Sequence, residues 1–169
     1  MSKTGIFYGS TTRNTWFVAK LIREAFGNDP KLMDIAEAQP GDIQECDNLI
    51  LGVSTWGFGD PQYDWDDFLP NLDKLDLVGK KVALFGLGDQ EAYHDSFANG
   101  LKALYDKVIE RGGSIVGRWP LEEYDFTYST AVSDGRFVGL IIDQDNQRHL
   151  THERISKWVS DIKAEFKVN

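Results

Sequence analysis

The sequence predicts a doubly wound α/β domain built on a five-stranded parallel sheet. Strand and helix patterns alternate along the 169 residues, the strand patterns are short and apolar, and the helix patterns are amphipathic. Short apolar runs are typical of parallel strands, because helices cover both faces of such a sheet. No linker, repeat or low-complexity segment interrupts the alternation, so we expect residues 1–169 to form a single domain.

Apolar runs mark where the strands are expected. TGIFYG, NLILGV and KVALFG are the clearest of them, and KLMDI is weaker and leads into a predicted turn at Pro40-Gly41. The predicted strands occupy residues 4–9, 31–35, 48–53, 81–86 and 114–118, and a further strand pattern follows at 137–142.

Apolar residues at helical spacing predict the helices between these strands. A first helix ends at Gly27, a short one covers about 65–73, and a third ends at Gly112-Gly113. The residues that define the first, third and last helices are Val18, Leu21, Ile22, Ala25 and Phe26; Phe97, Leu101, Leu104 and Val108; and Ile155, Trp158, Val159, Ile162 and Phe166.

Charge excludes two classes of partner. Eighteen Lys and Arg residues against 27 Asp and Glu give a net charge of −9, which disfavours nucleic acid and anionic membranes and favours a basic partner. No apolar run approaches the roughly 20 residues of a membrane span. The N-terminus has no signal-peptide pattern and Cys46 is the only cysteine, so we expect a cytoplasmic protein without disulfides.

The loop after the first strand carries short hydroxyl and amide side chains at the start of a helix. Because a helix N-terminus presents free N–H groups, such a loop suits a terminal phosphate. The phosphate-loop pattern of nucleotide triphosphatases and the GxGxxG dinucleotide pattern are both absent. An ordinary helix cap remains the alternative interpretation. The residues concerned are Ser10, Thr11, Thr12, Arg13, Asn14 and Thr15.

Two further loops place aromatic rings just after buried strands. Trp56 follows the third strand among glycines, and Tyr93 follows the fourth. Ligands of doubly wound sheets bind at the carboxyl ends of the strands. Either ring alone could simply pack against neighbouring loops. Together with the phosphate-like loop, we expect the two rings to sandwich a planar heterocycle.

These motifs, taken in order, resemble the flavodoxin family, specifically its long-chain members. The resemblance covers residues 4–166 and rests on YGSTTRNT, STWGFG, ALFGLGDQEAY, FVGLIIDQDNQ and the TxERIxxW helix. It implies the sheet order 2-1-3-4-5 and marks 119–136 as the insertion that splits the last strand in long-chain flavodoxins.

By this resemblance the cofactor is non-covalently bound FMN. The hydroxyl loop would hold its phosphate, Trp56 and Tyr93 would cover the ring, and Asp145 would lie at the ribityl chain. The remaining site residues implied by the two ring loops are Ser54, Thr55, Gly57, Phe58, Gly59, Leu87, Gly88, Asp89 and Asp95.

Arg13 departs from the family pattern, which has glycine at this place in the phosphate loop. A glycine there indicates either a backbone angle awkward for other residues or a close approach to the ligand. Arg13 either points to solvent and begins the helix or reaches toward the phosphate.

The resemblance implies a one-electron carrier that cycles between neutral semiquinone and hydroquinone at low potential. In flavodoxins the peptide after the first aromatic ring turns over on reduction, and Gly57 suits a turn that needs a positive φ. Residues 55–100 hold nine acids and three lysines, a net −6 that would oppose the anionic hydroquinone.

The implied partners are an NADPH-dependent flavodoxin reductase and acceptors such as radical enzymes or nitrogenase. We expect the protein itself to be a monomer. The alternative function is an FMN-dependent reductase acting directly on a small substrate such as a quinone. We expect no catalytic residue and no metal site, because no nucleophile–base pattern or metal spacing is present.

Overall fold

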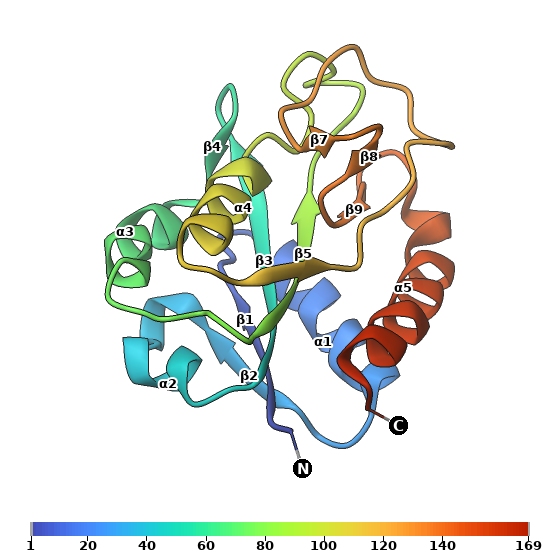
Figure 1. The fold of residues 1–169 in the computed structure, drawn as a ribbon. Helices are drawn as coiled ribbons and strands as arrows, with labels where there is room; N and C mark the ends of the chain where they lie inside the picture. Colours follow the sequence, from blue (N-terminus) through green and yellow to red (C-terminus); the bar gives the residue numbers. More distant parts are fainter. Residues whose placement is uncertain (1, 169) are drawn as a thin grey trace.

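The computed structural model describes residues 2–168, in which a parallel sheet of order β2-β1-β3-β5-β6 lies between helices. Figure 1 shows the strands running side by side, with their carboxyl ends at the upper edge of the view. The five main strands are β1 (Thr4–Tyr8), β2 (Lys31–Asp34), β3 (Asn48–Trp56), β5 (Lys81–Leu87) and β6 (Ser114–Val116). The predicted order 2-1-3-4-5 is confirmed, since β5 and β6 are the fourth and fifth main strands.

The central strands are as apolar as the sequence predicted. Every residue of β1 is buried, and β5 is buried from Val82 to Leu87. Each face of a central parallel strand packs against helices, so neither face requires polar residues. The sheet therefore forms the middle of the hydrophobic core.

The last strand is split in two, as the resemblance implied. β6 pairs with the first half of β5, and β9 (Leu140–Ile142) pairs with its second half, Phe85–Leu87. The interruption covers 117–139, slightly longer than the predicted 119–136. Gly139 explains where the strand resumes, because a Cβ there would lie 2.1 Å from the carbonyl oxygen of Leu84. Only glycine permits this approach of the two backbones.

The inserted segment, residues 117–139, packs against the sheet through aromatic rings. It contains a small hairpin, β7 (Val132–Ser133) with β8 (Arg136–Phe137). The Phe137 ring is fully buried, and its centroid lies 5.2 Å from Tyr124 and 5.4 Å from Phe126. The segment is therefore part of the core and not a loose loop.

Helices cover both faces of the sheet (Figure 1). α1 and α5 pack together on one face, and α3 and α4 lie on the other. Their bounds are α1 (Asn14–Phe26), α3 (Tyr63–Leu72), α4 (Leu101–Glu110) and α5 (Thr151–Phe166).

Three local predictions were wrong or incomplete. Pro40-Gly41 opens the short helix α2 (Pro40–Gln44) and does not form a simple turn, since proline is favoured in the first turn of a helix. α4 begins at Leu101, and Phe97 lies before it in the aromatic cluster. β3 extends to Trp56 because the two-residue strand β4 (Asp60–Pro61) pairs with its end.

Among residues 2–168, no helix is both long enough and apolar enough to cross a membrane.

Candidate functional site

A cavity of about 210 Å³ opens where β3 and β5 end. Ligands of doubly wound sheets bind at this edge, beside the point where the strand order reverses. The sequence predicted all of the lining residues except Gln144. The lining residues are Thr12, Asn14, Ser54, Thr55, Trp56, Gly57, Leu87, Gly88, Asp89, Tyr93, Gln144 and Asp145.

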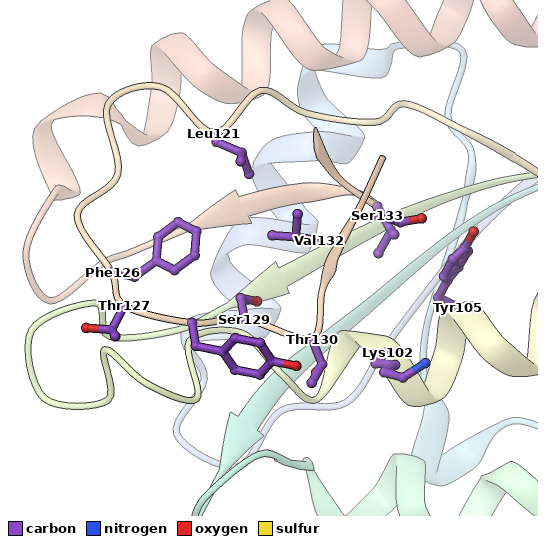
Figure 2. A pocket seen from close by; sticks show the side chains of 11 residues that line it. Lys102, Tyr105, Leu121, Phe126, Thr127, Ser129, Thr130, Val132 and Ser133 are labelled. Atoms are coloured by element: carbon purple, nitrogen blue, oxygen red, sulfur yellow. The ribbon is translucent and has the colours of Figure 1, made fainter. Parts of the chain in front are cut away.

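A larger groove of about 530 Å³ lies elsewhere, between α4 and the inserted segment. Figure 2 shows Lys102 and Tyr105 of α4 on one side and Leu121 and Phe126 on the other. The Lys102 ammonium is already paired with Asp106. The groove lies outside the strand ends and collects none of the predicted site residues, so the smaller cavity is the better candidate.

The predicted phosphate loop places two of its six residues on the cavity. Thr12 and Asn14 line it, at the N-terminus of the 13-residue helix α1. This end has no acidic residue in its first turn, so its partial positive charge is not neutralised locally. The others are occupied differently: Ser10 Oγ accepts the Trp16 N–H at 3.3 Å, and Thr15 is buried inside the helix.

Arg13 precedes the helix in a left-handed conformation, with φ 71°. Its side chain is exposed and lies over the Trp16 ring, with the guanidinium carbon 4.7 Å from the ring centroid. Lys20 stacks on the same ring at 5.5 Å. Trp16 thus packs against two cationic side chains. Arg13 does not line the cavity.

Gln62 is a supporting residue that sequence reasoning missed. It is fully buried, and its amide donates to the Thr11 hydroxyl at 3.0 Å, which holds the phosphate-like loop against the start of α3. Gly9 makes room for it, because a Cβ there would lie 2.2 Å from the Gln62 oxygen. No local sequence pattern predicts such a contact, because the two residues are 51 positions apart.

Trp56 and Tyr93 both line the cavity and remain about half exposed, 43% and 47% respectively. The Trp56 indole N–H donates to Ser54 Oγ at 3.0 Å, which fixes its orientation. Large rings with this exposure, on loops over a cavity, offer flat apolar faces to a flat ligand.

The loop after Trp56 is a tight turn. The Gly59 N–H donates to the Trp56 carbonyl at 3.3 Å, and Gly57 has φ 57°. The positive φ falls at the second residue of the turn, as in the primed turns of hairpins, which agrees with the expectation that Gly57 occupies a position needing a positive φ. Phe58 at its tip is 91% exposed and does not line the cavity.

Carboxylates surround the second half of the cavity. The pKa of Asp89 is lowered: burial raises it, but the N–H groups of Ala92 and Glu91 and the Asn146 amide outweigh that effect. Desolvation, reinforced by Asp89 and Asp143, raises the pKa of Asp145. Asp95 is exposed and lies outside the lining.

Comparison with known proteins decides which family this geometry belongs to. A model of the flavodoxin family matches residues 6–158. Flavodoxin 1 of Salmonella typhimurium is 46% identical over 168 residues, covering 98% of this chain and 96% of that protein. A flavodoxin of Nostoc is 45% identical over 165 residues, covering 97% of each chain. The chain belongs to the flavodoxin family.

Solved flavodoxin structures agree with this assignment. The flavodoxin of Fusobacterium nucleatum, solved bound to flavin mononucleotide, superposes with a TM-score of 0.94 at 34% identity and covers 98% of this chain and 99% of its own. Flavodoxin 2 of Bacillus cereus gives a TM-score of 0.74 at 26% identity, over 98% and 100% of the two chains. Flavodoxins are small FMN-dependent electron carriers and not enzymes, so the alternative of a substrate reductase is not supported.

The residues around the cavity fit an FMN group. The cavity combines hydroxyl and amide donors at a helix N-terminus with two half-exposed rings, as a phosphate joined to a flat ring requires. Gly88 lines the cavity, and the place of its missing side chain is taken by protein, since a Cβ there would meet Phe97 Cε1 at 3.0 Å and the Ala98 nitrogen at 3.1 Å. The donor set therefore agrees with the family's cofactor.

Proposed function

We propose that this flavodoxin binds FMN without a covalent bond in the 210 Å³ cavity and carries single electrons at low potential. FMN supplies the redox chemistry when it is bound, accepting and releasing one electron at a time. The observation that carries the proposal is the pairing of a hydroxyl-lined helix N-terminus with two half-exposed rings in one cavity.

The chain's own residues would bind and orient the cofactor. Thr12 and Asn14 would donate to the phosphate, whose charge the N-terminus of α1 also favours. Trp56 and Tyr93 would cover the two faces of the ring and limit its contact with water. Asp145 would lie at the ribityl chain. The backbone of Gly57 and Gly88 would meet the polar edge of the ring.

The acidic residues would act on the potential and on docking. Asp89, whose pKa is lowered, stays ionised beside the cavity at neutral pH and would oppose negative charge on the ring. Asp66 and Asp67 at the start of α3 are exposed. They would attract a basic partner to this edge of the sheet.

The finer assignments follow the family resemblance. We propose that the partners are an NADPH-dependent flavodoxin reductase and acceptor enzymes such as radical enzymes or nitrogenase. We also propose that the protein acts as a cytoplasmic monomer.

The test of this function compares two flavins in one titration. Thr12→Val removes a hydroxyl that would face the phosphate, so it should weaken FMN binding by about ten- to a hundredfold, the value of one hydrogen bond to a charged group. Binding of riboflavin, which lacks the phosphate, should not change. Apoprotein that binds neither flavin, or a variant that loses both equally, would contradict the assignment.

A further inference from the structure

Asp143 is a fully buried carboxylate at the end of β9. Its Oδ2 accepts hydrogen bonds from the Gln90 backbone N–H at 3.0 Å, the Gln90 side-chain amide at 2.7 Å and the Asn146 side-chain amide at 2.8 Å. Its Oδ1 accepts the Asn146 backbone N–H at 3.1 Å. Burying a charge is costly unless donors surround it, and here four N–H groups do so.

These bonds join two of the loops that carry cavity residues. Gln90 belongs to the loop after β5, and Asn146 to the loop after β9. The Asn146 amide continues the network to Asp89 Oδ1 at 2.8 Å. Asp89 in turn holds the turn that leads to Tyr93, since its backbone carbonyl accepts the Tyr93 N–H at 2.9 Å.

The network also reaches the inserted segment. The side-chain oxygen of Gln90 accepts the Asp125 N–H at 2.7 Å, so one glutamine links Asp143 to the insertion. Each end of Gln90 is thereby fixed. Its side-chain N–H donates to the Asp143 carboxylate, and its side-chain oxygen accepts the Asp125 backbone N–H.

We propose that Asp143 is a positioning residue for the flavin cavity, holding the Tyr93 loop and the Asp145 loop in one arrangement before the cofactor binds. The inference rests on the proposed function, because it concerns the same cavity. A cofactor that meets ordered loops pays no ordering cost on binding. Asp143 itself does not line the cavity, so it acts through Gln90, Asn146 and Asp89.

The hydrogen-bonding partners of Asp143 indicate which substitution tests the proposal. All four partners of Asp143 are donors, so the site needs an atom pair that only accepts. Asp143→Asn keeps the shape but turns one acceptor into a donor that faces N–H groups. We expect binding of both FMN and riboflavin to weaken about tenfold, the order of ordering two side chains and their loop. Backbone amide hydrogen exchange at residues 89–93 and 144–147 of the full-length apoprotein should become faster.

Two variants separate positioning from a general structural defect. Asp76→Asn is the control, because Asp76 also accepts a backbone N–H, from Val78 at 3.0 Å, but lies just before β5, at the opposite end of the sheet. It should change neither flavin binding nor exchange at these loops. Gln90→Glu added to Asp143→Asn reverses the polarity of the pair and restores its charge, so it should recover part of the lost affinity. A global defect would not be rescued.

The outcomes decide the proposal. Asp143→Asn with flavin binding and loop exchange equal to those of Asp76→Asn would overturn it. If Asp143→Asn does not fold, Asn146→Ala tests the same link, since it cuts only the connection from Asp143 to Asp89 and should show the same changes on a smaller scale. Wild-type apoprotein that binds no flavin would overturn the proposed function, whereas the exchange experiment would still judge the role of Asp143.

Discussion

Arg13 is a non-glycine residue held in a left-handed backbone conformation at the start of α1. An L-residue in the left-handed region costs about 1–2 kcal/mol, and its guanidinium recovers part of this by stacking on Trp16. The flavodoxin family pattern has glycine at this position of the phosphate loop. In this chain the loop has a positive φ at this position, the conformation that glycine adopts without strain.

Arg13→Gly and Arg13→Ala separate the backbone cost from the side chain. Both remove the stack on Trp16, but only glycine adopts φ 71° without strain. The free energy of unfolding of the Arg13→Gly apoprotein, measured by urea denaturation, should therefore exceed that of Arg13→Ala by about 1 kcal/mol. Equal free energies of unfolding would show that the strain is relieved elsewhere.

Gly57 is the second residue whose positive φ matters. A Cβ there has room, since its nearest contact would be Asp60 Oδ2 at 3.6 Å, so a substitution acts through the backbone and not through a clash. Gly57→Val should lower the yield of the blue one-electron-reduced flavin in a redox titration, because the turn becomes strained.

Gly79→Val is the matched control for Gly57. Its φ is 83°, a Cβ there meets nothing within 4 Å, and it precedes β5 at the amino end. It should lose a similar amount of stability and keep the yield of reduced flavin. An unchanged yield in Gly57→Val would remove Gly57 from the account of the potential.

The inserted segment is the element whose role the sequence least revealed. Phe137 packs against Phe97, which precedes the segment in the chain, and against Tyr124 and Phe126 within it. The buried Phe137 ring anchors the inserted segment in the hydrophobic core, whereas a segment of polar residues alone would lie outside the core. Asp125 and Thr127 then bond to Gln90 and His94 in the Tyr93 loop. The segment also bonds the loop after β9, since the Gln147 amide donates to the Glu123 carbonyl at 2.6 Å, so it supports two of the loops around the cavity.

Phe137→Ala measures how firmly the segment is packed. Removing a fully buried ring should lower the free energy of unfolding by about 3–5 kcal/mol in the apoprotein. Phe58→Ala is the control, since that ring is 91% exposed and its loss should change stability by less than about 0.5 kcal/mol. Similar effects of the two changes, measured by urea unfolding, would show that the segment is not part of the core.

At the scale of the molecule, the net charge of −9 is unevenly distributed. Nine acids and three lysines fall in 55–100, the stretch that carries both ring loops. Their field should attract a basic partner to the carboxyl edge of the sheet, and salt should screen that attraction.

Electron transfer to a basic partner should therefore slow severalfold as ionic strength rises. Asp66→Asn with Asp67→Asn should lower the rate and flatten its dependence on salt, because both carboxylates are exposed on α3 near this edge. Glu24→Gln with Asp161→Asn removes the same charge late in α1 and α5 and should leave the rate unchanged. Stopped-flow kinetics at several salt concentrations measures both pairs. Equal effects would show that only net charge matters.

The sequence by itself determined the fold class, the strand order through its family resemblance, and most of the cavity lining. These depend on burial patterns and on residues that directly follow strands, and both are local along the chain. Trp56, Tyr93 and Thr12 were predicted because each stands at a strand end or a helix start.

Only the tertiary structure decided how these residues are held. Gln62 meets Thr11 across 51 positions, and Asp143 meets Gln90 across 53. Arg13 adopts its angle in a loop whose shape depends on such contacts. Hydrogen bonds between distant segments leave no periodic trace in a sequence, because any polar residue on a loop has the same local pattern whether or not it is buried. Their geometry exists only once the sheet brings the loops together.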